Sequence, residues 1–459
     1  MGSPDAYRES LRDSRRVFYD GQVVEDVTVH ARFIAAVDAV ARGFEDSGTD
    51  GDIFEFPRSA NDLRERLSRL ERWEVMRITT LESLLTLQTV ASRMRDQHPE
   101  LVRRISTYVQ YSRDNDLRCV QAITDAKGDR SKSPAEQSDP DLYLRIVERQ
   151  RDGIVINGAK LHISGAAIAN ELVVIPTKRM KAGEEDWAVA CAVPVDSPGI
   201  TILNTCPGPD PCAAPAYYPH SSFHAIPEGF VVFDHVFVPN DRVFLDGQTR
   251  YSADFAHSLG LWQRLGGVAQ MAREADMLTG FAQLLAEANG LANIPHIKDK
   301  IRDLIVYATI IRSGLEAAVS NATITDEGFA IPDEVYTNVA KYYGAAELST
   351  MIRNLHDIGG GSVLTAPQPG DIANPEVRPY VEKYMVGADV NGDSRTELFH
   401  AVRDLTADRY GGWWQVASLM SGGGLFAQKL VAAKHYDMDR AKALATEVMH
   451  RWRAEGTGS

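Results

Sequence analysis

Cysteine is scarce in this sequence. The 459 residues contain four cysteines, and none lies within residues 1–118. So few scattered cysteines cannot form a disulfide framework. Long apolar runs are absent too, and the N-terminal segment MGSPDAYRES has no apolar core typical of a signal peptide. The sequence therefore predicts a cytoplasmic protein without a membrane segment.

An excess of basic residues is also absent. The chain has 49 Lys and Arg against 63 Asp and Glu, a formal net charge of −14. Because nucleic-acid phosphates require a basic surface, we expect no nucleic-acid partner. A small acidic substrate needs only one local cation and is not excluded.

The chain also lacks a GxGxxG segment between a strand and a helix, which excludes the Rossmann type of dinucleotide site. What is present is the composition of a globular protein, 44% hydrophobic and 24% charged. Because the chain is longer than one ordinary core requires, we expect two or three domains.

Three regions differ in their hydrophobic pattern. Residues 1–118 have helical spacing, residues 119–246 have short β-rich runs separated by turn residues, and residues 247–459 are helical again. The pattern predicts an α+β fold that is mainly α. Its parts are an N-terminal helical domain over these first residues, a middle β-barrel (or sandwich) domain and a C-terminal four-helix bundle. The long helices of the bundle are expected at Leu261–Ala288, Asp299–Ser320 and Tyr336–Ile358.

Two blocks carry the chemistry. The first, Ala122–Ser131, combines a hydroxyl, two carboxylates and two cations: Thr124, Asp125, Asp129, Lys127 and Arg130. Such a segment suits a polar, phosphate-bearing ligand, because Gly128 permits close backbone approach and the cations supply charge. The second, Gly158–Ala166, is typical of a strand. Simple alternation would place Lys160, His162 and Ser164 on one face.

In this order and spacing, the two blocks resemble the flavin-binding segments of the 4-hydroxyphenylacetate 3-monooxygenase and 4-hydroxybutyryl-CoA dehydratase family, which has the acyl-CoA dehydrogenase fold. Further similarities follow in the family's order, at Tyr7–Asp13, Arg16–Gly21, Asp26–His30, Phe233–Arg242 and Ile358–Thr365. The chain is identified as a member of this family on these segments together.

The resemblance implies that the cofactor is FAD. It places Thr124 and Ser164 beside the isoalloxazine ring, where such groups stabilise negative charge on the reduced flavin. His162 would lie against the ring, although a solvated strand histidine is the alternative. The glycine segment Gly359–Gly361 would lie near the adenine or pyrophosphate end of FAD and meet a neighbouring subunit; without the family, a helix C-cap followed by a turn is the favoured interpretation. The residues expected to bind the FAD cofactor are Ile123, Thr124, Asp125, Lys127, Gly128, Asp129, Arg130, Ser131, His162, Ile163, Ser164, Gly359, Gly360 and Gly361.

The substrate residues depart from the family pattern. The phenol hydroxylases of the family carry a histidine where this chain has Gln121, and an Arg and a Tyr four residues apart where it has Arg77 and Leu81. An amide cannot take a proton at neutral pH. The candidate catalytic residues are Arg77, Gln121 and His162. Arg77 either holds a substrate carboxylate or is a solvated helix residue.

A metal site is not expected. The dehydratase branch holds a [4Fe–4S] cluster through three cysteines and one histidine, with two of the cysteines in the N-terminal helical domain, which has none here. Cys206, Cys212, His220 and His224 lack the tight spacing of a zinc site.

The first hypothesis is therefore a two-component monooxygenase. It would use FADH2 from a separate flavin reductase, together with O2, to oxygenate a small aromatic or related substrate. The alternative is a cluster-free flavin-dependent acyl dehydratase, isomerase or dehydrogenase with His162 as the nearest base. A second alternative is a flavin-binding subunit without enzymatic activity.

We also expect a homotetramer. The expected helices Leu261–Ala288 and Asp299–Ser320 carry apolar stripes wide enough for a bundle, through which the relatives assemble. The glycine-rich, aromatic stretch Gly412–Phe426 is expected to pack against a neighbouring subunit.

Overall fold

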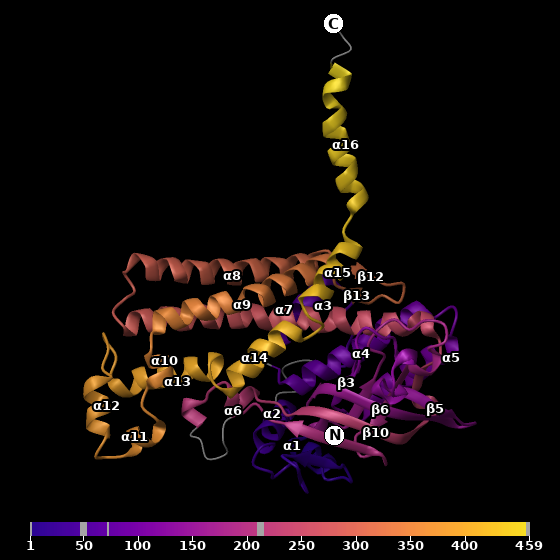
Figure 1. The fold of residues 1–459 in the computed structure, drawn as a ribbon, viewed down its shortest axis with the longest axis horizontal. Coiled ribbons are helices and arrows are strands. Elements are labelled where there is room, and N and C mark those ends of the chain that lie inside the picture. Colours follow the sequence, from indigo (N-terminus) through magenta and orange to yellow (C-terminus); the bar gives the residue numbers. More distant parts are fainter. Residues whose placement is uncertain (1, 46–52, 71–72, 209–214, 456–459) are drawn as a thin grey trace.

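The computed structural model describes residues 2–45, 53–70, 73–208 and 215–455. A first group of helices precedes two β-sheets, and a second group of longer helices follows them (Figure 1). None of the helices in these described ranges is long and apolar enough to cross a membrane.

The N-terminal helices are α1 (Pro4–Ser10), α2 (Ile34–Glu45), α3 (Ala60–Leu70), α4 (Val75–Met94) and α5 (Pro99–Asp114). Of these, α4 packs mainly on α5 and on elements from later in the chain. α4 is buried on nearly all sides, so its sequence shows almost no polar face.

A short hairpin interrupts these helices. β1 (Val17–Tyr19) and β2 (Gln22–Val23) flank Asp20 and Gly21, which both have positive φ, as a two-residue hairpin turn requires. β1 also pairs in parallel with β9 of the larger sheet. The helical pattern expected for the N-terminal domain is therefore wrong at residues 17–23.

The two sheets are open. The larger has seven strands in the order β2-β1-β9-β10-β6-β4, with β5 also on β6, and the smaller has the order β11-β8-β7-β3. The remaining strands of these two sheets are β3 (Cys119–Ala122), β4 (Thr124–Asp125), β5 (Arg145–Arg149), β6 (Gly153–Ser164), β7 (Glu171–Val174), β8 (Val189–Pro194), β9 (Ile200–Thr205), β10 (Glu228–Pro239) and β11 (Val243–Asp246), and β12 (Thr323–Ile324) pairs with β13 (Ala330–Ile331) in a separate hairpin.

The middle domain, predicted as a barrel or a sandwich, does not form a closed barrel, because that requires the edge strands to pair with each other. Here the larger sheet ends in the two-residue strands β2 and β4, which do not bond to the smaller sheet. Buried side chains of both sheets, including Val120, Leu172 and Val231, instead share one apolar core.

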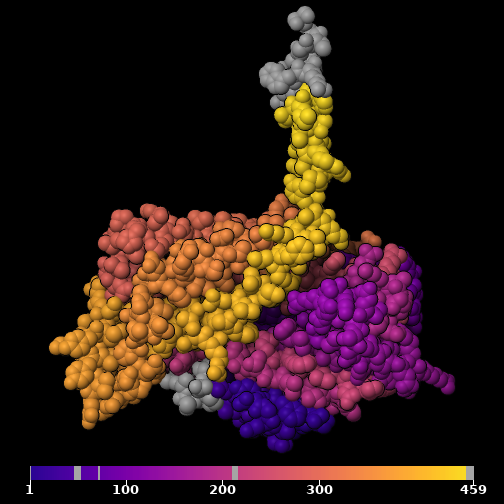
Figure 2. Space-filling model, viewed as in Figure 1, coloured from indigo at the N-terminus to yellow at the C-terminus, as the bar shows by residue number. Residues whose placement is uncertain are grey.

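Three long helices dominate the C-terminal part: α7 (Thr249–Ala288), α8 (Pro295–Ser320) and α9 (Glu334–Gly359). They pack on one another around a common core, and the short α15 (Leu425–His435) packs on α9 as the fourth member of the predicted bundle. α10 (Ser362–Thr365), α13 (Gly392–Thr406) and α14 (Arg409–Met420) lie beside this bundle. α16 (Met438–Glu455) projects away from the body (Figure 2).

Candidate functional site

A buried ion pair joins the two sequence blocks. Lys160 Nζ of β6 lies 2.8 Å from Asp125 Oδ1 of β4, and both side chains are about 2% exposed. Lys160 also donates to the carbonyls of Ile123 (2.9 Å) and Ile175 (3.0 Å). Burial lowers the pKa of Lys160, and the charge of Asp125 opposes that shift.

The carboxylate of Asp125 also accepts hydrogen bonds from two other residues of the β-domain. Its Oδ1 accepts the Leu144 N–H at 2.9 Å, and its Oδ2 accepts the hydroxyl of Thr177. The carboxylate therefore fixes the position of β4 on β6, and both its oxygens are already hydrogen-bonded. A cofactor contact of this side chain stays a prediction.

The register of β6 against β10 slips within the second block. The pairs are Lys160–Val231, Ile163–Gly229 and Ser164–Glu228. The extra residue forms a β-bulge at His162, which has a φ of +61° and an exposed ring. Lys160 and Ile163 consequently share the buried face, and Ser164 lies on the other. The prediction that Lys160, His162 and Ser164 share a face is wrong.

Ser164 belongs to a hydrogen-bonded network that sequence reasoning missed. Its Oγ donates to the Glu228 carboxylate, at 2.9 Å from Oε2 and 3.0 Å from Oε1. Trp413 Nε1 of α14 donates to the same Oε1 at 2.8 Å. The network thus connects β6, β10 and the C-terminal helices. No local pattern in the sequence marks Glu228, which is the first residue of a strand.

Thr124 and Ile123 of the first block are both partly buried, as a contact with a bound cofactor requires. Thr124 pairs with Leu161 of β6 and is half-buried, and its hydroxyl forms no hydrogen bond within the part of the chain that the structure describes. Ile123 is partly buried against an apolar core cluster. A half-buried hydroxyl with spare hydrogen-bonding capacity is suited to a polar ligand.

The loop after β4 exposes its cations. Arg130 is exposed and Lys127 is half-buried; partial burial and the nearby Arg130 lower the pKa of Lys127. Asp129 accepts the backbone N–H (3.0 Å) and the hydroxyl (2.7 Å) of Ser131, which shapes the turn.

Gly128 allows close packing of this loop against the rest of the chain. Its φ is +46°, and a Cβ there would lie 2.5 Å from Leu142 Cδ1 and 2.6 Å from Gln137 Oε1. The absence of a side chain at Gly128 thus permits close contact with the chain's own residues, where the sequence predicted close contact with a ligand.

The candidate substrate residues lie around the start of α4. Arg77 is only 3% exposed, and its guanidinium stands 5.7 Å from the centre of the Trp73 ring. The reading of Arg77 as a solvated helix residue is therefore wrong. Gln121 of β3 is also buried, and its Nε2 donates to the Thr79 carbonyl of α4 at 2.7 Å.

Glu74 organises this end of α4 and was not anticipated. Its carboxylate accepts the N–H groups of Met76 (2.5 Å) and Arg77 (3.0 Å), as an N-cap does. Burial raises the pKa of Glu74 to about 7, although Arg118 and Arg77 oppose the shift. Glutamate is not a favoured capping residue, so the sequence carried no signal for it.

The substrate residues and the second block meet at Gly165. A Cβ on Gly165 would lie 2.4 Å from Met76 Sδ of α4 and 3.7 Å from Val120 Cγ1 of β3. The end of β6 therefore lies directly against the residues next to Arg77 and Gln121. The fold brings Arg77, Gln121 and Ser164 onto three adjoining elements.

The glycine segment lies elsewhere in the same chain. Gly359 ends α9, and Gly360 and Gly361 connect it to α10, at the end of the long helices away from β3 and β6 (Figure 1). No hydrogen bond among the described residues joins them to the two sequence blocks. Gly360 and Gly361 are exposed.

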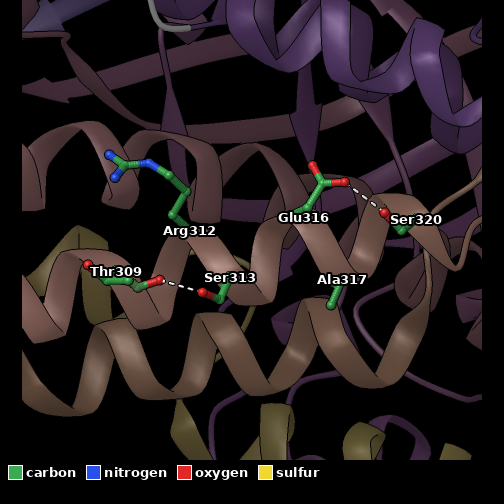
Figure 3. Close-up of a pocket in the computed structure, with 6 residues that line it drawn as sticks. All are labelled: Thr309, Arg312, Ser313, Glu316, Ala317 and Ser320. Carbon is green, nitrogen blue, oxygen red and sulfur yellow. Dashed lines mark hydrogen bonds between the residues drawn. The ribbon is translucent and has the colours of Figure 1, made fainter.

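Two hollows in the described part of the chain lie away from the sequence blocks. One, of about 480 Å³, lies along the outer face of α8, where every lining residue belongs to that helix (Figure 3). The second, of about 20 Å³, lies between α3, α4 and α7, and Leu81 and Glu82 border it. Burial raises the pKa of Glu82 to about 8. Neither hollow contacts the two sequence blocks.

No group of three or more His, Cys, Asp or Glu side chains that could hold a metal ion occurs within the described ranges. Cys206 is buried there, whereas Cys212 lies outside the described residues.

Two family models cover the chain almost from end to end. Residues 3–245 match "4-hydroxyphenylacetate 3-hydroxylase N terminal", and residues 252–450 match "4-hydroxyphenylacetate 3-hydroxylase C terminal".

Among curated proteins, the chain is 26% identical over 429 residues to the 4-hydroxyphenylacetate 3-monooxygenase oxygenase component of Thermus thermophilus, covering 88% of each chain. It is 27% identical over 363 residues to the 4-hydroxybutyryl-CoA dehydratase/vinylacetyl-CoA-Delta-isomerase of Clostridium aminobutyricum, covering 75% of this chain and 73% of that protein.

Solved structures show the same fold. The oxygenase component of a 4-hydroxyphenylacetate 3-monooxygenase, complexed with FAD, matches 98% of this chain and 99% of its own with a TM-score of 0.88 at 24% identity. Butyryl-CoA dehydrogenase from Megasphaera elsdenii matches 88% of each chain with a TM-score of 0.51 at 14% identity. The predicted acyl-CoA dehydrogenase-like architecture is confirmed.

Proposed function

Because the chain belongs to the 4-hydroxyphenylacetate 3-hydroxylase family, we propose that it is an FAD-dependent oxidoreductase, the FADH2-using oxygenase component of a two-component monooxygenase. The observation that carries the proposal is the match of both family halves along one chain. Related proteins with FADH2-dependent or oxygenase-component names support it. A flavin reductase supplies FADH2, and O2 is the co-substrate.

The two sequence blocks fit a flavin in their chemistry. The Thr124 hydroxyl has spare hydrogen-bonding capacity, and Lys127 and Arg130 place positive charge at the surface for phosphate groups. Reduced FAD supplies the electrons that activate O2. The protein's part is to hold this cofactor between β4, β6 and their neighbours, and to keep water away from the substrate.

The substrate is a small aromatic acid or a related anion. Arg77 is a buried cation beside an aromatic ring, an arrangement suited to holding a carboxylate against an apolar wall. Gln121 anchors β3 to α4 and keeps its amide near the same place. Since Leu81 and Gln121 cannot take a proton, the chain handles no phenolic proton through these two positions.

The assembly is a homotetramer, with the glycine segment Gly359–Gly361 contacting the adenosine end of FAD held by another copy. Apolar side chains that are about half exposed or more support this assembly: Ile305 and Val306 on α8, Phe426 and Leu430 on α15, and Leu444, Val448 and Met449 on α16. The tryptophans of Gly412–Phe426 contact their own chain, since Trp414 is buried and Trp413 bonds to Glu228. The division into domains at 118/119 and 246/247 and the cytoplasmic location stay predictions.

The decisive experiment supplies the full chain with enzymatically reduced FAD under 18O2 and a panel of small aromatic acids. We expect one 18O atom in a product detected by mass spectrometry, only when both reduced FAD and the protein are present. Reduced FAD that is oxidised without any labelled product, across the whole panel, would contradict the proposal.

A second candidate is an oxygen-independent flavin-dependent acyl dehydratase, isomerase or dehydrogenase. The 27% identity with the dehydratase/isomerase of Clostridium aminobutyricum favours it. Anaerobic mixing of the oxidised, FAD-loaded protein with acyl thioesters would bleach the flavin, or form a dehydrated or isomerised product, if this candidate is correct. An unchanged flavin spectrum and unchanged thioesters exclude it for the compounds tested.

A further inference from the structure

Glu228 occupies a distinctive position between two groups of elements. It is the first residue of β10, it stands opposite Ser164 of β6, and Trp413 of α14 reaches it from the C-terminal helices. One carboxylate therefore accepts a hydroxyl and an indole N–H at the same time. Burial raises the pKa of Glu228, while these two hydrogen bonds oppose the shift.

The titratable groups that interact with Glu228 are His162 and Cys206, and two arginines lie near Cys206. His162 of β6 lowers the pKa of Glu228, and the charge of Glu228 in turn contributes to the raised pKa of the Cys206 thiol, which follows β9. The positive charges of Arg409 in α14 and of Arg32 before α2 oppose this rise in the pKa of the same thiol. No ion pair of Glu228 with a cation forms within the residues that the structure describes, so its charge is stabilised mainly by the hydrogen bonds from Ser164 and Trp413, with a smaller contribution from His162.

The direction of the Ser164 hydrogen bond has a chemical consequence. An ionised carboxylate only accepts hydrogen bonds, so the single hydroxyl proton of Ser164 is committed to Glu228. A protonated carboxyl group has its own O–H to donate. With Glu228 protonated, its O–H can donate to Ser164 Oγ, and the Ser164 proton becomes available for a ligand, while Glu228 still accepts from Trp413.

We propose that Glu228 couples the binding of reduced FAD to the uptake of one proton from solvent. The carboxylate binds Ser164 and Trp413 in the cofactor-free protein, and it becomes a neutral acid when the negatively charged reduced flavin binds beside Ser164. Two nearby negative charges in a partly buried site disfavour each other, and protonation of the carboxylate removes one of them. No electron moves in this step. Glu228 is a positioning residue, because it acts through Ser164. The inference rests on the proposed function.

The test measures the affinity of the full-length protein for anaerobically reduced FAD between pH 5.5 and 9. Binding is followed by quenching of tryptophan fluorescence, and proton uptake by calorimetry in buffers of different ionisation enthalpy. For the wild type we expect uptake of close to one proton, and a dissociation constant that rises by up to about tenfold per pH unit above the pKa of Glu228. In Glu228→Gln the neutral amide imitates the protonated acid, so this extra dependence on pH disappears.

Two comparisons make the result specific. The titration of the flavin itself is common to wild type and Glu228→Gln, so only the difference between them is assigned to Glu228. Asp234→Asn changes an exposed carboxylate on the same strand, with 77% of its side chain accessible, and we expect the wild-type profile from it.

The outcomes separate this inference from the proposed function. Reduced FAD that binds without proton uptake, or with the same pH profile in wild type and Glu228→Gln, overturns the role of Glu228 and leaves the proposed function standing. A wild-type protein that does not bind FAD at any pH overturns both. Should Glu228→Gln fail to fold, Trp413→Phe replaces it in the comparison: loss of the indole N–H raises the pKa of Glu228, so the dissociation constant starts to rise at a higher pH than in the wild type, and an unchanged profile overturns the role of Glu228.

Discussion

Lys160 contacts Asp125 directly, and their 2.8 Å ion pair joins the two sequence blocks of this chain. Both charges are buried, and each has further hydrogen bonds from the backbone or from Thr177. Loss of one partner would leave the other charged, buried and only partly satisfied.

Lys160→Met is therefore expected to lower the free energy of unfolding by about 3–5 kcal/mol. The measurement is urea denaturation followed by circular dichroism. Lys132→Met is the matched control, because the Lys132–Asp129 pair has a longer distance of 3.6 Å and is about half exposed, and such solvent-screened pairs contribute little to stability. Equal effects of the two substitutions would contradict the structural role of the buried pair.

The second prediction concerns Arg77 and substrate charge. If Arg77 binds a carboxylate, Arg77→Met should weaken binding of an aromatic acid by about 10- to 100-fold, since a hydrogen bond to a charged group contributes roughly 1.5–3 kcal/mol. The corresponding neutral amide should lose little. Steady-state KM and kcat for the acid and the amide provide the measurement, with the melting temperature as a check on folding. An equal loss of affinity for both compounds would show that Arg77 does not bind the substrate carboxylate.

The third prediction is a pH dependence of stability that originates in Glu82. Burial raises its folded-state pKa from 4.5 to about 8, so between these values the folded state binds a proton that the unfolded state has lost. The stability that the protonated acid contributes is complete below about pH 4.5 and is lost as pH rises toward about pH 8.

Glu82→Gln removes this dependence. Its stability relative to the wild type should rise between pH 5 and pH 8 by on the order of 1–3 kcal/mol, as measured by urea denaturation at several pH values. Glu65→Gln changes an exposed carboxylate on neighbouring α3 and should show no such trend. A wild type and a Glu82→Gln variant with parallel profiles would refute the assignment.

The fourth prediction tests the glycine segment. Gly361 has an ordinary φ of −60°, and a Cβ there meets no atom within 4 Å, so Gly361→Ala leaves the fold and its stability unchanged. If the segment contacts FAD bound to another copy, the added methyl group should weaken FAD binding about tenfold. Fluorescence titration measures this. Gly370→Ala, also in open space, is the control. Unchanged FAD affinity would leave the segment as a helix terminus only.

The fifth prediction concerns the projecting helix α16. Leu444 and Val448 lie four residues apart, on one helix face, and are 53% and 63% exposed. Replacing both with Asp should lower the mass measured by light scattering from four chains toward the 50.6 kDa of a single chain. Lys442→Gln, a polar change on the same helix, should leave the mass unchanged. A wild-type mass equal to one chain, with FAD bound, would refute the tetramer itself.

Features that depend on neighbouring residues could be predicted from the sequence. The long helices α7, α8 and α9 follow from apolar periodicity over many turns, and β6 follows from its alternating pattern. The order of the quoted motifs was sufficient to identify the family, which the two family models confirm. The hairpin at Asp20-Gly21 carries a local signal that could have been read as well, because this dipeptide is typical of such turns.

Features that depend on residues far apart in the chain were decided only by the tertiary structure. The bulge at His162 arises from pairing with β10. It puts Lys160 and Ser164 on opposite faces of β6, whereas simple alternation predicted one face for both. The burial of Arg77 depends on the packing of α4, and the bond from Trp413 to Glu228 crosses from α14 to β10. Local sequence determines which backbone conformation is favoured. Which polar groups become partners is decided by the free energy of burying them together, and that term exists only once distant segments have packed.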